Sequence, residues 1–148
     1  MSTDPSAVFR RYLSAMVLNS LAAAEAAGLN ATDYYALNLL DLTGPLTSGE
    51  LAAQIGLTTG ATTRLIDRLE RTGYVRRAPD PADRRKVMVE TVAEPEGLDE
   101  VLQGTRTRLA EVIQGYPEAE QATLWSYFER AADAYRDATD ELIKTRDS

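Results

Sequence analysis

The side chains best suited to chemistry in this chain are basic ones gathered in a single segment. Eight of the 16 basic residues lie between positions 58 and 86, where only four acidic residues accompany them. The whole chain is acidic, with 23 acidic residues and a formal net charge of −7. Guanidinium groups form fork-shaped, charge-assisted hydrogen bonds with phosphates and carboxylates. A localised basic segment on an acidic protein therefore favours binding of a polyanion through one face.

The amino-acid composition excludes several other kinds of chemistry. The 148 residues include no cysteine and no histidine. Disulfides, thiol catalysis, a Ser-His-Asp triad and the usual nitrogen and sulfur ligands of zinc are therefore excluded. Carboxylates are plentiful, but no two have a recognisable catalytic spacing. We expect no enzyme, no cofactor and no metal site.

The N-terminal region has two interpretations. Arg10 and Arg11 precede an apolar stretch, YLSAMVLNSLAAA, that resembles the charged and apolar regions of a secretory signal. Ser20 and Glu25 interrupt this pattern, and apolar residues recur in it at helical spacings of three and four. We therefore favour a helix at the start of a cytoplasmic protein. No run of 18 apolar residues occurs, so we expect neither a transmembrane helix nor a membrane partner.

The basic segment is preceded by clear signals for short helices. A helix is expected from Asn30 to about Leu42, followed by a break at residues 43–45. The sequence Thr47-Ser-Gly-Glu50 is a capping box that starts a short helix. Thr58 can cap the next helix, which is expected to continue to Gly73. One stripe of this helix is predicted to be buried and consists of Thr62, Leu65, Ile66 and Leu69. The opposite stripe is predicted to be exposed and consists of Gly60, Thr63, Arg64 and Asp67.

Beyond Gly73 the hydrophobic period changes from that of a helix to that of a strand. Residues 74–77 and 86–92 read as two strands, joined by the proline-containing connection APDPADRR. The order of helix, short helix, turn, helix and β-hairpin is that of a winged helix-turn-helix. The fold expected is therefore mainly α, with a small β-hairpin wing.

Further helices are predicted at both ends of this winged segment. Apolar stripes run through the N-terminal helix and through two helices after residue 97, the last of them opening at Pro117. Together they offer more apolar surface than a core of about 65 residues can cover. We therefore predict a homodimer with a dimerisation helix at 1–28, a winged DNA-binding domain at 29–97 and dimerisation helices at 98–148.

The shape and charge of the winged segment indicate how it would read double-stranded DNA. An α-helix fits the major groove, and small side chains in its first turn permit close approach. Threonine hydroxyls can reach base edges or phosphates, and the guanidinium of Arg64 can form two hydrogen bonds with a guanine. Arg68 and Arg71, further along the helix, are expected to contact backbone phosphates. The predicted contacts on this helix are Thr58, Thr59, Gly60, Thr63, Arg64 and Arg68.

The hairpin supplies the second set of predicted contacts. Arg84 and Arg85 lie where a wing would touch the adjacent minor groove, whose narrow A·T stretches attract arginine. Asp83 cannot itself favour a phosphate. We expect it to hold an arginine in place through a charged hydrogen bond.

These segments resemble a known family. The stretches LTSGELAAQIGLTTGATTRLIDRLERTGYVRR and DPADRRKVMVETV resemble the DNA-binding core of the MarR family of transcriptional regulators. The resemblance implies a homodimer joined by N- and C-terminal helices, usually a repressor that releases DNA when a small, often phenolic, ligand binds between the two regions. It places Asp83 and Arg85 in the Asp-x-Arg motif of the wing, with Arg85 as the minor-groove arginine.

Two features depart from the family pattern. The usual Leu-Thr-x-x-Gly after the wing is replaced by TVAEPEG, which lengthens the link to the next helix and leaves its register open. The cysteine of the oxidation-sensing branch is absent, which excludes that mode of sensing.

The prediction is a DNA-binding transcriptional regulator, a repressor of a near-palindromic operator that a small-molecule effector releases. The alternative is a winged-helix protein-interaction or dimerisation module that binds no DNA, which would gain little from groove-face and wing arginines. At the level of single residues, Arg64 could be a solvated charge, and Asp67 and Glu70 offer local ion pairs to Arg68 and Arg71. Tyr12, Met16, Tyr34 and Tyr35 could line a cavity, but core or dimer contacts are favoured, and no ligand residue is assigned.

Overall fold

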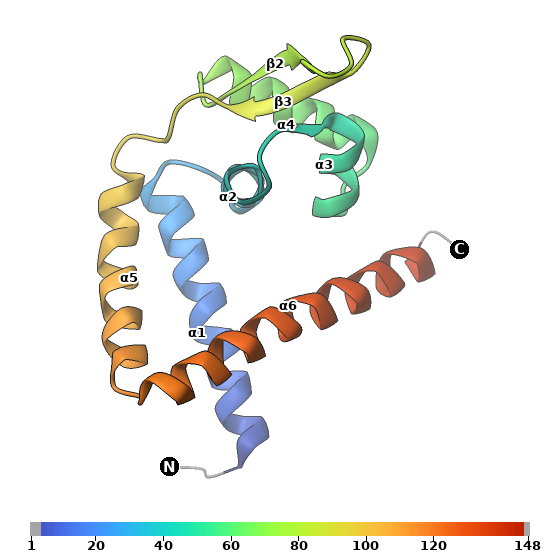
Figure 1. Ribbon diagram of the computed structural model, residues 1–148. Helices are drawn as coiled ribbons and strands as arrows, with labels where there is room; N and C mark the ends of the chain where they lie inside the picture. The colour runs from blue at the N-terminus through green and yellow to red at the C-terminus, as the bar shows by residue number, and fades with distance from the viewer. Residues whose placement is uncertain (1–3, 147–148) are drawn as a thin grey trace. The chain divides into compact units, whose positions relative to one another are not determined.

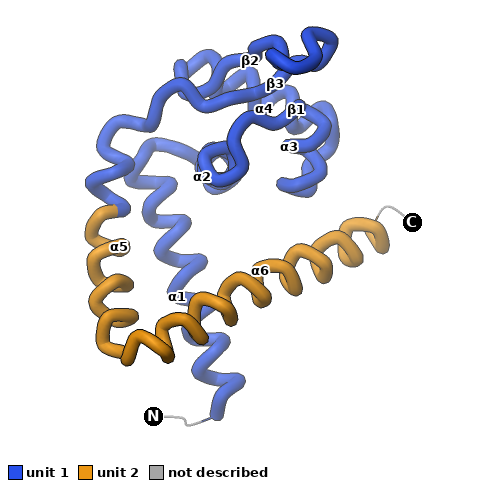
Figure 2. The backbone as a smooth tube through the Cα atoms, viewed as in Figure 1, with its two compact units in different colours: residues 1–102 blue, residues 103–148 orange. Residues whose placement is uncertain are grey.

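The computed structural model describes residues 4–146 of the chain (Figure 1). The chain divides into two compact units, Met1–Leu102 and Gln103–Ser148 (Figure 2). The expected division into functional parts at residues 28 and 97 stays a prediction. In chain order the elements are α1 (Pro5–Ala26), α2 (Ala31–Thr43), β1 (Leu46–Thr47), α3 (Ser48–Ile55), α4 (Thr59–Arg71), β2 (Val75–Pro79), β3 (Val87–Thr91), α5 (Leu98–Gln114) and α6 (Glu118–Arg146).

The helix starts in the first unit follow the local capping signals in the sequence. Asn30 accepts a hydrogen bond from Asp33 N at 2.8 Å and caps α2. Thr47 and Glu50 form both hydrogen bonds of the predicted capping box, at 3.0 and 3.1 Å. Gly56 then ends α3 in the left-handed conformation, with φ 69°, which costs glycine little because it has no Cβ. These capping predictions are confirmed.

The sheet has three antiparallel strands in the order β1–β3–β2. The sequence predicted only the hairpin, because the two residues of β1 are too few to show an alternating pattern. β1 pairs Leu46 with Val89. The prediction that Pro79 lies in the hairpin connection is wrong, since Pro79 belongs to β2 and pairs with Val87. Proline is tolerated there because β2 is an edge strand of the sheet.

One hydrophobic core holds α2, α3 and α4 against this sheet. The stripe predicted to be buried on α4 is buried, including the polar Thr62, whose hydroxyl donates to Thr58 O at 2.9 Å. The hairpin lies along α4, and its connection projects beyond the sheet (Figure 1). The buried core consists of Ala36, Leu37, Leu39, Leu40, Leu51, Leu65, Ile66, Leu69, Val75 and Val89. This core fixes the positions of α4 and the hairpin.

The N-terminal helix and, separately, the C-terminal helix expose large apolar side chains. In α1 the buried residues are Ala23 and Ala24, near its C-terminal end. In α6, no residue that the structure describes is buried. Within residues 4–146, no single helix has the length and apolar character of a membrane span, although α1 and α2, bent by 97° at their junction, pass that test as a pair on length and composition alone.

Candidate nucleic-acid interface

The exposed stripe of α4 presents small and basic side chains, as the sequence predicted. Gly60, Thr63 and Arg64 are exposed, while Leu65 and Ile66 on the opposite side are fully buried. A helix held by its apolar side in this way presents the whole of its polar side to a ligand. The N-terminal half of α4 therefore has the shape and chemistry of a helix that enters a groove.

The hydroxyls of Thr58 and Thr63 already have partners within α4. Thr58 Oγ1 accepts from Ala61 N at 3.2 Å, which makes Thr58 the N-cap. Thr63 Oγ1 donates to Thr59 O at 3.0 Å. Thr58 thus has a structural role in starting the helix. The predicted DNA contacts of Thr58, Thr59 and Thr63 stay predictions.

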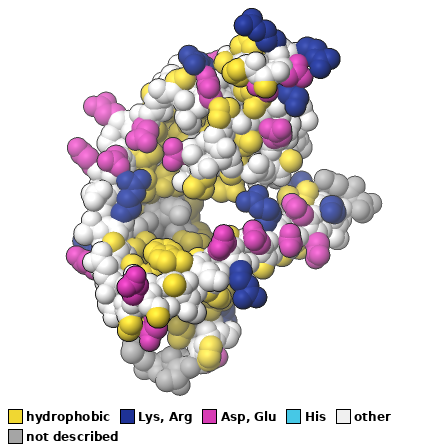
Figure 3. Space-filling model, in the orientation of Figure 1, with side chains coloured by type: hydrophobic (Ala, Val, Ile, Leu, Met, Phe, Trp, Pro, Cys, Tyr) yellow, Lys and Arg dark blue, Asp and Glu magenta, His cyan; other side chains and the backbone are white. Residues whose placement is uncertain are grey.

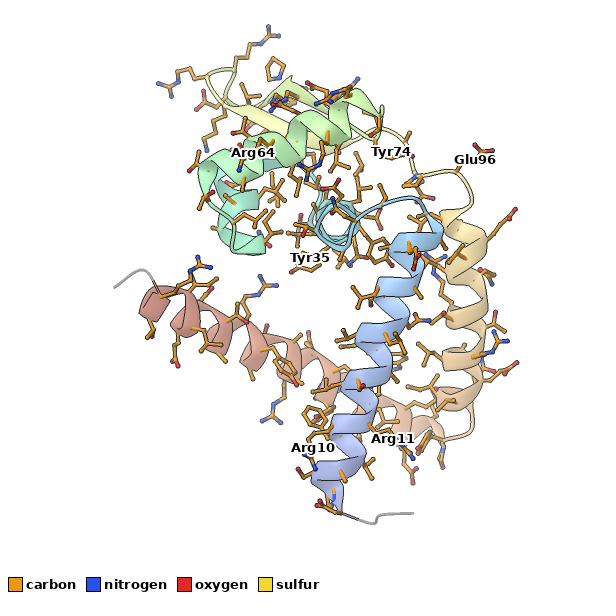
Figure 4. All side chains as sticks on the ribbon, turned by 180° about the vertical axis from the view of Figure 1, so that it is seen from behind. Arg10, Arg11, Tyr35, Arg64, Tyr74 and Glu96 are labelled. Carbon is orange, nitrogen blue, oxygen red and sulfur yellow. The ribbon has the colours of Figure 1, made fainter. Side chains whose placement is uncertain are left out.

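Arg64 lies on the exposed side of α4 (Figure 4). A Cβ atom added at Gly60 would lie 3.7 Å from Arg64 Nη1, so the guanidinium extends back along the first turn of the helix. This direction follows from helix geometry, in which side chains tilt toward the N-terminus. Gly60 leaves room for the guanidinium at the end of α4 where the helix dipole also favours anions.

The tip of the hairpin carries a second set of cations. The side chain of Arg85 is 91% exposed, and its Nε donates to Asp83 Oδ1 at 3.0 Å. The Arg85 backbone N donates to the same oxygen at 3.1 Å. These hydrogen bonds from Arg85 lower the pKa of Asp83 below its ordinary value. The predicted Asp83–Arg85 contact is confirmed, whereas the DNA contacts of Arg84 and Arg85 stay predictions.

Arg68 has a partner that the sequence did not indicate. Its Nη2 donates to Asp33 Oδ1 of α2 at 2.8 Å, and its Nε donates to Asp33 Oδ2 at 3.2 Å. Asp33 is buried, and this hydrogen bond raises the pKa of Arg68 above its usual value. The alternative in which Arg68 pairs locally with Asp67 or Glu70 is not what the structure has, and the favoured contact of Arg68 with DNA stays a prediction. The sequence did not identify Asp33 as the partner of Arg68, because an acidic residue is common in the first turn of a helix, where it interacts favourably with the helix dipole.

Asp67 and Glu70 bind an arginine of the hairpin instead. Arg77 Nη2 lies 2.8 Å from Asp67 Oδ1, and Arg77 Nη1 lies 3.0 Å from Glu70 Oε1. Arg76, the other arginine of β2, is exposed and pairs with Glu90 across the hairpin at 2.6 Å.

Basic side chains gather over the hairpin tip on the face seen in Figure 3. Arg84, Arg85 and Lys86 are all exposed there. The ion pairs of Arg68, Arg76 and Arg77 neutralise much of the remaining positive charge of the segment. The positive charge available to a polyanion therefore lies at the hairpin tip, at Arg64 and at Arg71, which is exposed at the C-terminal end of α4.

A separate cavity of about 440 Å³ lies between α1 and α2, within the first unit. Tyr35 of α2, labelled in Figure 4, is one of its lining residues. Met16 and Tyr34 line it as well, whereas Tyr12 is not among its lining residues. The other lining residues are Val17, Ser20, Leu21, Ala31 and Asn38.

Comparison with known proteins identifies relatives along most of the chain. The sequence model of the MarR family matches residues 27–86. Two regulators of Bacillus subtilis (strain 168), both described as uncharacterized HTH-type transcriptional regulators, are similar over longer stretches. YcgE is 36% identical over 136 residues, which cover 91% of this chain and 88% of YcgE. YkoM is 31% identical over 118 residues, which cover 79% of this chain and 77% of YkoM.

Solved structures share the fold at lower sequence identity. A mutant of MepR from a multidrug-resistant S. aureus clinical isolate aligns with a TM-score of 0.73 and 17% identity, covering 91% of this chain and 99% of MepR. Apo MarR from E. coli aligns with a TM-score of 0.57 and 21% identity, covering 88% of this chain and 98% of that protein. The predicted winged helix-turn-helix fold is confirmed.

Proposed function

Because the chain belongs to the MarR family of transcriptional regulators, we propose that it is a cytoplasmic, homodimeric repressor that binds a near-palindromic operator and releases it when a small molecule binds. The observation that carries this proposal is the exposed pair of surfaces in the first unit: the N-terminal half of α4, with Arg64, and the hairpin tip, with Arg84 and Arg85. The protein-interaction alternative offers no reason for cations at these two positions.

DNA recognition would divide between these two surfaces. Thr63 and Arg64 would read base edges in the major groove, where an arginine can form two hydrogen bonds with guanine, and Gly60 would allow the helix to approach closely. Arg85, held by Asp83, would reach into the adjacent minor groove. Arg84 and Lys86 would neutralise phosphates, which strengthens binding without adding sequence specificity.

The exposed apolar residues of the terminal helices support the proposed homodimer. In α1, Leu18 is 68% exposed, and Phe9 and Val17 are exposed as well. In α6, Leu142 is 72% exposed, and Trp125 and Phe128 form an exposed aromatic pair with ring centroids 6.0 Å apart. A second copy of the chain would cover these residues. Two-fold symmetry would then present one α4 to each half of a palindromic site, and a dimer bound across a promoter would exclude RNA polymerase from that DNA.

The cavity between α1 and α2 supports the proposed response to a ligand. Its volume, about 440 Å³, suits a small organic molecule. Its lining is mostly apolar, and Ser20, Tyr34 and Asn38 add a few groups that can form hydrogen bonds. This combination favours a small aromatic compound with one polar substituent, such as a phenol or an aromatic acid.

The decisive experiment selects bound fragments from random duplex DNA and then measures affinity for the selected operator by fluorescence anisotropy. We expect a near-palindromic site, an affinity that falls steeply with salt, and release by a subset of small aromatic acids. The Arg85→Ala variant should bind the operator about 1–3 kcal/mol more weakly while remaining folded. The charge-matched control is Arg136→Ala in α6, which should bind like the wild type.

Three results would contradict the proposal. Failure of the folded protein to select any duplex would favour the protein-interaction alternative. A salt-independent affinity would be incompatible with contacts to several phosphates. Unchanged affinity of the Arg85→Ala variant would exclude the wing contact.

A further inference from the structure

We propose that Asp33 and Arg68 form a positioning pair that sets the rotation of α4 for DNA reading, and that Arg68 is not released from Asp33 to bind a phosphate. The inference rests on the proposed function and assigns roles to two residues of the same site. Asp33 would act from α2, through its contact with Arg68.

The geometry of the pair is that of a bidentate fork. Nη2 and Nε of Arg68 each donate to a different oxygen of Asp33, at 2.8 and 3.2 Å. Asp33 is 6% exposed, and its own backbone N donates to the capping side chain of Asn30 at 2.8 Å. The acceptor is therefore fixed at the start of α2, where the chain is already held by the cap.

A directional contact of this kind restricts rotation of α4 about its axis more strongly than apolar packing does. Leu65, Ile66 and Leu69 attach α4 to the core through non-directional burial, which tolerates small rotations of a helix about its axis. A bidentate charged hydrogen bond has a fixed direction and a fixed length. Because Thr63 and Arg64 precede Arg68 on the same helix, the fork determines how far these two side chains face the groove.

The burial of Asp33 also argues against release of Arg68 to a phosphate. Moving the guanidinium to DNA would leave a buried carboxylate without its cation. Such an unpaired charge is far more costly than a single exposed phosphate contact is favourable. Arg68 should therefore remain on Asp33 in the complex with DNA.

Substitutions at both positions test the pair through the salt dependence of operator binding. Arg68→Lys keeps the charge, so it would preserve a phosphate contact, but it cannot form the fork. Asp33→Asn keeps the shape of the carboxylate and removes its charge. We expect each variant to bind the operator about tenfold more weakly, the effect of one charged hydrogen bond. The slope of log affinity against log salt should stay at the wild-type value, and the double variant should be no weaker than either single one.

The control for the slope is Arg84→Gln, which should remove one phosphate contact and reduce the slope by about 0.9. Circular dichroism and urea unfolding show whether each variant is folded. If Asp33→Asn fails to fold, Arg68→Lys decides the question on its own.

Two results would overturn the inference while leaving the proposed function in place. One is wild-type affinity of Arg68→Lys. The other is an Arg68→Gln variant that reduces the salt slope as Arg84→Gln does, while Asp33→Asn binds normally. Failure of the wild-type protein to bind any duplex would instead overturn the proposed function, and the inference with it.

Discussion

Arg77 of β2 donates from Nη2 to Asp67 Oδ1 of α4 across 2.8 Å, and this ion pair joins the wing to the helix proposed to enter the major groove. Glu70, one turn further along α4, accepts from both the Arg77 guanidinium, at 3.0 Å, and the Arg77 backbone N, at 3.1 Å. The two proposed DNA-binding surfaces are thus connected through one side chain. Arg77 thus adds a polar connection between α4 and the hairpin to the apolar core that they share.

Arg77→Ala should weaken this connection. The Arg77 side chain is 30% exposed and has two acidic partners, so we expect the free energy of unfolding in urea to fall by about 1 kcal/mol. Operator affinity should fall as well, because only the shared apolar core then holds the wing against α4. The control is Arg76→Ala, which breaks the more exposed pair with Glu90 and should cost less than about 0.5 kcal/mol. Equal effects of the two substitutions would contradict a special role for Arg77.

Thr58→Ala should destabilise α4 at its N-terminus. The hydroxyl of Thr58 accepts from Ala61 N, and loss of such a cap costs about 1 kcal/mol. Thr58→Ser keeps the capping oxygen and should unfold at the wild-type urea concentration. If serine fails to restore stability, the Thr58 methyl group, rather than the cap, is the important feature.

The Asp83–Arg85 contact should be lost at acidic pH and should not change with pH near neutrality. Arg85 lowers the pKa of Asp83, so the contribution of the pair is fully present above the ordinary aspartate pKa. It is lost as the pH falls through the lowered value, when the carboxylate takes up its proton. NMR titration of the Asp83 carboxyl carbon should show this low pKa, and Arg85→Gln should raise it toward 3.8. An Asp83 pKa that is the same in both proteins would mean that the contact is absent in solution.

Single charges on the exposed apolar positions should disrupt the proposed dimer. Leu18→Glu in α1 and Leu142→Glu in α6 each place a carboxylate where we expect a second copy to pack. Light scattering should report about twice the 16.2 kDa chain mass for the wild type and a lower mass for each variant. Leu42→Glu is the control, because Leu42 is 75% exposed but lies on α2. A wild-type protein that is monomeric at micromolar concentration would exclude the dimer.

Local signals in the sequence were sufficient for most of the fold and for part of the candidate interface. Caps at Asn30, Thr47 and Thr58 lie within three residues of the groups they bind, so their types and spacing identify them. The buried stripe of α4 follows from helical periodicity. The Asp83–Arg85 contact also spans only two residues.

Contacts between distant parts of the chain required the tertiary structure. Asp33 and Arg68 are 35 residues apart, and Arg77 is 10 residues from Asp67. Each arginine had several acidic residues within reach in sequence, and only the packing of α2, α4 and β2 around one core decides which partner it meets. The strand β1 exists because β3 offers it hydrogen bonds, and its two residues carry no pattern of their own. The sequence determines the chemical type and the local spacing of the residues. Which of several equivalent acidic residues each arginine contacts is determined only by the packing of the core.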